Sequence, residues 1–99
     1  MQKTIYSPEL RLFLDLLKHC REAQGVTQVE LASRLDWEQT LVSRTERGAR
    51  RLDVLELRRW LEALGIELAE FIAELEEILQ KNTPPGARRT RKQSADRLK

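Results

Sequence analysis

The sequence has 99 residues with 40% hydrophobic and 5% aromatic content, which leaves room for one domain around a small, mainly aliphatic core. Its one cysteine excludes an intrachain disulfide, and no apolar run approaches the roughly 18 residues that span a membrane, so we expect a cytoplasmic protein without a signal peptide. The net charge of +2 divides unevenly, because residues 1–80 hold 11 Lys and Arg against 15 Asp and Glu, whereas residues 81–99 hold seven Lys and Arg against one Asp.

The first predicted helix spans residues 8–24. Ser7 and Pro8 are typical of an N-cap and a first helical turn, and Gly25 is typical of the left-handed position that follows a helix. Leu12 and Leu16 fall outside the main apolar stripe, so this helix is apolar on more than one face. The stripe itself consists of Leu10, Phe13, Leu14, Leu17, Cys20 and Gln24.

Two short helices are predicted next. Thr27 and Glu30 form the pattern of a capping box at the start of the second helix. The third helix is expected from residue 37 or 38 to residue 47, with Asp36 as its N-cap, and stops at Gly48. The second helix is expected to bury Leu31, Ala32 and Leu35.

The fourth helix is predicted to begin at Asp53, which forms a second capping-box pattern with Glu56, and to stop at Gly65. It is expected to bury Leu57, Trp60, Leu61 and Leu64. The fifth helix, residues 67–80, has more apolar positions than one short core face needs, namely Leu68, Phe71, Ile72, Leu75, Ile78 and Leu79. No segment alternates apolar and polar residues between turns. The fold class is therefore all-α, a compact five-helix domain over residues 1–80.

The remaining residues, 81–99, are predicted to form a flexible basic tail. The tail contains Pro84, Pro85 and Gly86, and no large apolar residue lies in 87–97, so that stretch cannot build a core. Its basic residues either follow the backbone of DNA and enter a minor groove or keep the protein in solution. They are Arg88, Arg89, Arg91, Lys92, Arg97 and Lys99.

Residues 25–48 carry the most informative pattern. They predict two short helices joined by about three residues, with small Ala32 where the two helices approach each other. A short helix that presents long or hydrogen-bonding side chains fits the major groove of DNA. The outward positions of the third helix hold such side chains, namely Gln39, Thr40, Ser43, Arg44 and Arg47.

Three sequence runs resemble the lambda-repressor-like (Cro-type, xenobiotic-response-element) helix-turn-helix family. They are Gly-x-Thr-Gln-x-Glu-Leu-Ala at 25–32, Gln-Thr-x-Val-Ser-Arg-x-Glu-Arg-Gly at 39–48 and Ala-Leu-Gly at 63–65. The resemblance covers residues 10–72 and implies a domain that binds double-stranded DNA. It assigns base reading to Gln39, Thr40 and Arg44, and it assigns contact with phosphates to Gln28 and Ser43. It also implies that Gln28 braces the recognition helix and that Arg21 and Glu46 form a structural ion pair.

Arginines after the third helix are further candidates for phosphate contact. Residues 34–51 hold five Arg and three acidic residues, a positive region on an acidic domain. Arg47, Arg50 and Arg51 either clamp phosphates or belong to a solvated loop. For Arg44, the alternative to base reading is an ordinary solvated helix position.

Three residues depart from the family pattern. Asp36 stands where glycine is usual, and Asp tolerates a left-handed conformation better than most residues. Glu38 stands where the family prefers a Ser or Thr cap, and its carboxylate repels phosphate. Thr45 replaces a large aliphatic residue. These departures bear on which bases are read rather than on the fold.

The other chemically distinctive residues favour packing roles. Trp37 and Trp60 lie at the spacing of core positions, and Cys20 lies in an apolar helical stretch. His19 has no second ligand nearby, so we predict no metal and no cofactor. With one His, one Cys, no glycine-rich phosphate loop and no paired carboxylates in an evident pocket, the sequence argues against an enzyme and contains no catalytic candidate.

The surplus apolar residues of the fifth helix, with Leu12 and Leu16, predict a second buried surface. We expect a homodimer there, because two-fold symmetry would place two recognition helices one turn apart on a palindromic operator. The alternative is that the fifth helix packs across the first within one chain.

These observations predict a sequence-specific transcription regulator, most simply a repressor, that associates with the nucleoid. The alternative is an antitoxin or adaptor of the same fold that works mainly through contacts with a protein partner such as a toxin.

Overall fold

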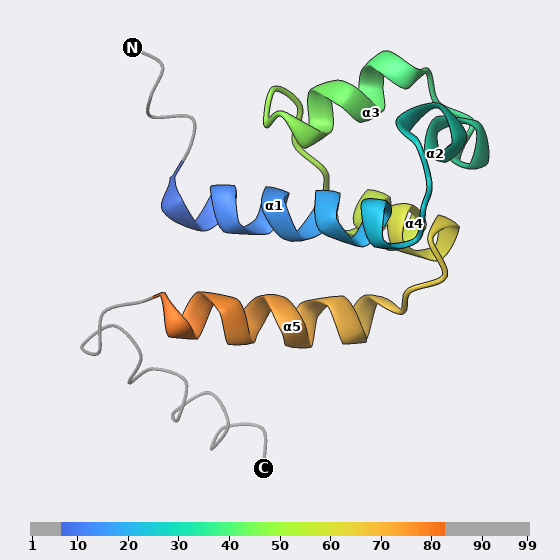
Figure 1. Cartoon of the computed structure of the whole chain (residues 1–99). Coiled ribbons are helices and arrows are strands. Elements are labelled where there is room, and N and C mark those ends of the chain that lie inside the picture. Colours follow the sequence, from blue (N-terminus) through green and yellow to red (C-terminus); the bar gives the residue numbers. More distant parts are fainter. Residues whose placement is uncertain (1–6, 83–99) are drawn as a thin grey trace.

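A computed structural model describes residues 7–82, and this part of the chain folds into helices without a strand (Figure 1). The elements are α1 (Pro8–Ala23), α2 (Gln28–Leu35), α3 (Gln39–Glu46), α4 (Val54–Ala63) and α5 (Leu68–Lys81). The long helices α1 and α5 run antiparallel side by side, α2 and α3 lie on the other side of α1, and α4 contacts both α2 and α5. The predicted all-α fold of five helices is confirmed. The predicted tail lies outside the described residues, apart from Lys81 and Asn82 at the end of α5.

The starts of α1, α2 and α4 follow the caps that the sequence predicts. The Ser7 hydroxyl accepts a hydrogen bond from the backbone of Leu10 at 3.0 Å. Thr27 and Glu30 form a reciprocal capping box at α2, and Asp53 and Glu56 form another at α4. Each box satisfies two backbone N–H groups that would otherwise lack partners at a helix start.

The turn between α2 and α3 corrects one prediction. Asp36 is not the N-cap of α3: it ends α2 with a left-handed φ of 63°, and Glu38 takes the N-cap position of α3 without a side-chain hydrogen bond. Asp36 N donates to Ser33 O at 3.2 Å and Trp37 N donates to Ala32 O at 2.9 Å, the two bonds of a Schellman motif. The turn requires a left-handed residue, and the tolerance of Asp for that conformation is confirmed.

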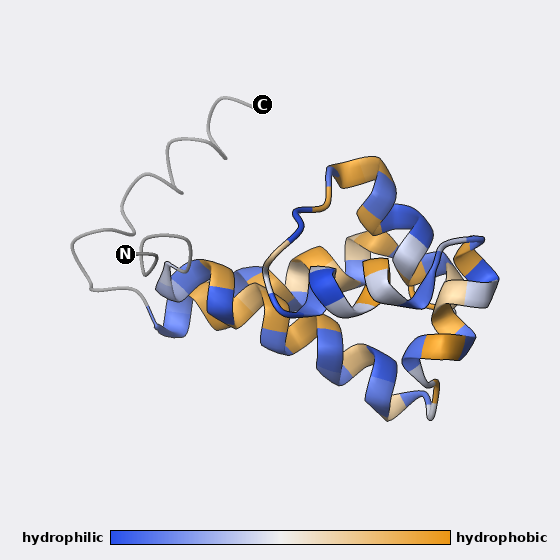
Figure 2. Cartoon of the chain, turned by 90° about the horizontal axis from the view of Figure 1, so that it is seen from above, coloured by the Kyte–Doolittle hydropathy of each residue, from blue (hydrophilic) through white to orange (hydrophobic). Residues whose placement is uncertain are grey.

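The core lies where α1, α2, α4 and α5 meet, and Figure 2 shows hydrophobic and hydrophilic residues mixed along each of these helices. Leu17, Leu31, Trp60 and Leu61 are completely buried in it. Leu16, which falls outside the apolar stripe of α1, is only 5% exposed and belongs to this core. Its expected part in a dimer interface is therefore wrong, because Leu16 is buried within one chain, in which α5 also packs against α1. No helix among residues 7–82 has the length and apolar character needed to cross a bilayer.

Two aromatic pairs connect elements that are distant in sequence. Phe13 of α1 meets Phe71 of α5 edge to face, with ring centroids 5.9 Å apart. Trp37 meets Trp60 in the same manner at 6.1 Å and so fixes the α2–α3 turn against α4. Such pairs contribute about 0.5–1.5 kcal/mol beyond the area that they bury. The predicted packing role of both tryptophans is confirmed.

Arg50 fastens the loop between α3 and α4. Its guanidinium carbon lies 4.8 Å from the centroid of the Trp37 ring, and its Nη2 donates to Glu56 Oε2 at 2.8 Å. The bond from Arg50, aided by the backbone N–H of Asp53, lowers the pKa of the Glu56 carboxyl. Glu56 thus takes part in the capping box of α4 and in the ion pair that holds Arg50 and its loop in place.

We predict that Glu56→Gln lowers the free energy of unfolding at neutral pH by about 1 kcal/mol, since it weakens both the cap and the ion pair. Because folding lowers the pKa of Glu56, its contribution is complete above the unfolded-state pKa and disappears as the pH falls through the folded-state pKa. Urea unfolding at neutral and acid pH should therefore show a smaller acid-induced loss in the variant. Glu62→Gln, which alters only an exposed pair with Arg58, is the control. Equal acid sensitivity of the wild type and Glu56→Gln would contradict the prediction.

Candidate DNA-binding surface

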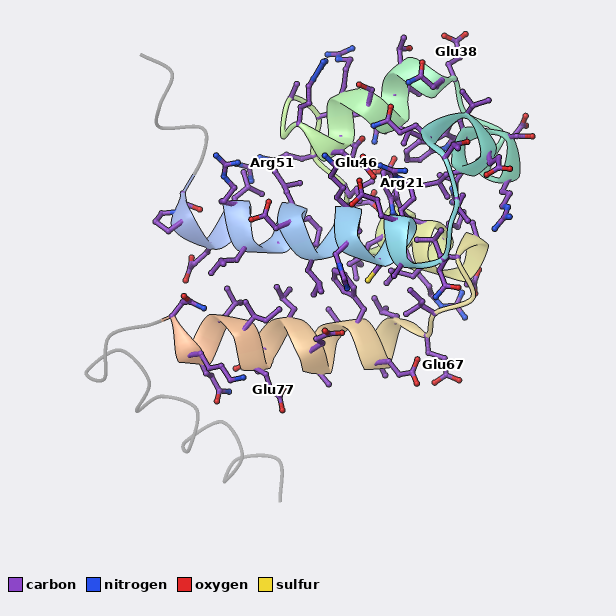
Figure 3. All side chains as sticks on the ribbon, in the orientation of Figure 1. Arg21, Glu38, Glu46, Arg51, Glu67 and Glu77 are labelled. Carbon is purple, nitrogen blue, oxygen red and sulfur yellow. The ribbon has the colours of Figure 1, made fainter. Side chains whose placement is uncertain are left out.

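A hydrogen-bonded network joins α1, α2 and α3 around the carboxylate of Glu46, whose side chain is 3% exposed. Arg21 donates to Glu46 through Nε at 2.7 Å and through Nη2 at 3.0 Å. Gln28 Nε2 donates to Glu46 Oε1 at 2.9 Å. The third nitrogen of the guanidinium, Nη1, donates to the backbone carbonyl of Val26 at 2.8 Å. Figure 3 shows Arg21 and Glu46 facing each other between α1 and α3.

Burial makes this network strong. A buried carboxylate is costly unless donors satisfy its oxygens, and here both oxygens of Glu46 accept bonds. The hydrogen bond to Glu46 raises the pKa of Arg21, which therefore stays charged. The pair that the resemblance implied is present, and it holds the C-terminal end of α3 against α1.

The network continues to the opposite end of α3. Gln39 Nε2 donates to Gln28 Oε1 at 2.8 Å. Gln28 is therefore bonded both to Gln39, the first residue of α3, and to Glu46, its last residue. Gln28 is half-buried and begins α2. The bracing of α3 by Gln28 is thus visible in the structure, and it orients Gln39 before any ligand binds.

The outer face of α3 lies at the edge of the molecule farthest from α5 (Figure 1). Thr40 and Arg44 are exposed on it, Gln39 is exposed beside them, and Ser43 is half-buried. Glu38 points outward at the start of the helix (Figure 3). The structure therefore brings Gln39, Thr40 and Arg44 together on one accessible helical face.

The loop after α3 contributes further cations. Arg47 and Arg51 are exposed, and Figure 3 places Arg51 above the first half of α1. Arg50 is half-buried, and Glu56 and Trp37 engage its guanidinium. No local sequence pattern predicted this contact of Arg50, because Trp37 lies in the α2–α3 turn, Arg50 in the loop after α3 and Glu56 in α4.

Thr45 shows how the core accommodates a polar residue where an aliphatic one is usual. Its side chain is 1% exposed, and Oγ1 donates to Leu41 O at 2.8 Å, one turn back along α3. The hydroxyl is therefore satisfied within its own helix. The inner face of α3 remains compatible with packing next to fully buried Val42.

Other reactive groups lie away from this surface. Cys20 is buried, and burial together with the charge of Glu74 raises the pKa of its thiol, which favours the unreactive protonated form. Among residues 7–82, no three His, Cys, Asp or Glu side chains gather where they would hold a metal ion.

Comparison with known proteins agrees with this geometry. The helix-turn-helix domain family matches residues 12–73 of the chain. Among solved structures, an XRE-family like protein from Pseudomonas syringae pv. tomato str. DC3000 is 41% identical with a TM-score of 0.70, over 77% of this chain and 93% of that one. The wild-type restriction-modification controller protein C.Esp1396I is 26% identical with a TM-score of 0.69, over 77% of this chain and 99% of that one. No curated protein sequence matches.

We predict that Arg21→Met lowers the free energy of unfolding by about 3–5 kcal/mol, because it leaves the carboxylate of Glu46 buried without its cation. Arg58→Met removes an exposed pair of the same type and should cost less than about 1 kcal/mol. Urea unfolding followed by helical circular dichroism measures both. A loss for Arg21→Met that is no larger than the loss for Arg58→Met would show that the network does not stabilise the fold.

Proposed function

The chain belongs to the XRE-like helix-turn-helix family of DNA-binding transcription regulators, and we propose that it is a repressor that binds a palindromic operator as a homodimer. The observation that carries the proposal is the braced outer face of α3, where Gln28 fixes Gln39 next to exposed Thr40 and Arg44. A small protein bound over a promoter represses by occupying it.

Base reading is assigned to Gln39, Thr40 and Arg44. An amide side chain pairs bidentately with adenine, and a guanidinium pairs bidentately with guanine, each worth about 1–3 kcal/mol of discrimination. A preorganised Gln39 loses less conformational entropy on binding than a free side chain would. The hydrogen bond from Gln39 to Gln28 therefore favours specific over nonspecific binding.

Phosphate contact is assigned to Gln28, Ser43, Arg47, Arg50 and Arg51. These contacts position the domain without carrying sequence information. Arg51 is exposed and acts directly, whereas Arg50 Nη2 is bonded to Glu56 and Nη1 is buried, so Arg50 meets a phosphate only when its side chain leaves this position.

We predict that Arg44→Ala relaxes sequence specificity at one base pair and weakens operator binding by about 1–3 kcal/mol, with little effect on nonspecific DNA. Arg51→Ala should weaken binding to all sequences alike and reduce the salt slope by about one phosphate. Selection of bound sequences from random duplex DNA defines the operator, and titrations at several salt concentrations measure both effects. Arg59→Ala, an exposed arginine on α4, is the control. Unchanged specificity in Arg44→Ala would contradict base reading and favour a protein partner.

A dimer interface is assigned to the apolar flank of α5 beside α1. Ile72 is 43% exposed there, and Leu79 lines a shallow groove together with Leu12 of α1. Because Leu16 is buried, Ile72, Leu79 and Leu12 are the apolar residues of α1 and α5 that remain available for contact with a second copy of the chain. A two-fold axis near this flank would present two copies of α3 to successive major grooves.

We predict that the wild type sediments as a dimer and that Ile72→Glu shifts it to a monomer, because the substitution places a charge in the centre of the interface. Leu55→Glu introduces the same charge at a residue that is 64% exposed on α4, and it should leave the dimer intact. A wild type that stays monomeric with and without operator DNA would overturn the dimer while leaving base reading by α3 to be judged separately.

A further inference from the structure

The flank of α5 opposite Ile72 borders a groove of a different chemical character. Its floor is apolar and its rim is acidic, with Glu70, Glu74 and Glu77 along one side. These three carboxylates follow a spacing of four and three residues, which places them on one face of a helix. The floor consists of Cys20, Ile66 and Phe71, and exposed Ala73 lies on the same face of α5 as the glutamates.

The carboxylates of this rim have no counter-charge in the described part of the chain. No basic side chain among residues 7–82 forms an ion pair with Glu70, Glu74 or Glu77, although pairs form elsewhere on the surface. Figure 3 shows Glu77 pointing away from α1 on the outer side of α5. Three like charges within two helical turns repel one another, so a cation that joins them stabilises the helix as well as the contact.

We propose that the chain's own basic segment, residues 83–99, docks along this acidic groove when DNA is absent and leaves it when DNA binds. The segment carries four cations within five residues, Arg88, Arg89, Arg91 and Lys92, which complement the rim in charge. Ala87 and the aliphatic stems of the arginines suit the apolar floor.

The length of the chain permits this return. α5 ends at Lys81, and five residues, 83–87, separate Asn82 from Arg88. Five residues reach up to about 17 Å, whereas Glu77 lies about 8 Å back along the helix axis from Asn82. Pro84, Pro85 and Gly86 fall where the direction must reverse, and proline and glycine favour such turns. Direct linkage to α5 also gives the segment a high effective concentration at the groove.

Docking of this kind regulates nonspecific DNA binding. The glutamates of the rim and the phosphates of DNA compete for the same arginines. The segment must therefore leave the groove before its arginines can contact DNA. Nonspecific binding, which depends almost entirely on phosphates, loses more from this competition than operator binding, which also uses the bases.

The first test uses the full chain without DNA, so it is independent of the proposed function. Neutralising the segment (R88Q, R89Q, R91Q and K92Q together) should shift the backbone amide resonances of Ile66, Ala73 and Glu74, and raising the salt concentration on the wild type should reproduce those shifts. Shifts confined to the substituted segment would overturn the proposal. Shifts that depend on protein concentration would assign the groove to the segment of a second copy and would also overturn it.

The second test asks whether the groove restrains DNA binding. E70Q/E74Q/E77Q in the full chain should raise affinity for nonspecific duplex DNA about fivefold more than D15N/E62Q/E76Q, a control with the same change in net charge at exposed sites outside the groove. The extra gain should vanish when the segment is also neutralised. Equal gains in the two triple variants, or a gain that persists in the neutralised segment, would refute docking even if operator binding by α3 is intact.

Discussion

The buried carboxylate of Glu46 is the constraint on which the functional end of the molecule depends. A charge that is 97% removed from solvent must be matched by donors, and the donors come from Arg21 of α1 and Gln28 of α2. Satisfying one carboxylate therefore fixes three helices relative to each other. The position of α3 follows from an electrostatic requirement as well as from apolar packing.

The sequence predicted most reliably what is decided locally. The side chains of Ser7, Thr27 and Asp53 each accept a hydrogen bond from the backbone N–H three residues further on. Their capping role can therefore be predicted from a short stretch of sequence. Asp36 was misassigned because an aspartate between two helices suits either an N-cap or a left-handed helix end. The choice depends on where α3 starts, which packing of Trp37 against Trp60 helps to set.

Contacts between residues that are distant in the chain could not be predicted from the sequence pattern. Family resemblance supplied the pairing of Arg21 with Glu46, but nothing in the pattern indicated that Arg50 would stack on Trp37 and bond to Glu56. The surplus apolar residues of α1 and α5 indicated a second buried surface. In the structure, Leu16 is buried within the chain, whereas Ile72 stays partly exposed. Periodicity identifies an apolar face without saying what covers it.

The distribution of charge makes two opposite edges of the domain differ in sign. The described residues hold more acidic than basic groups, yet four arginines lie on α3 and the loop that follows, namely Arg44, Arg47, Arg50 and Arg51. Glu77 of α5 lies at the opposite edge of the molecule (Figure 3). A polyanion therefore attracts one edge and repels the other, which biases encounters toward the orientation in which α3 meets the groove. The same separation leaves the α5 carboxylates without phosphates to meet, so a basic segment of the chain itself is a natural counter-charge for them.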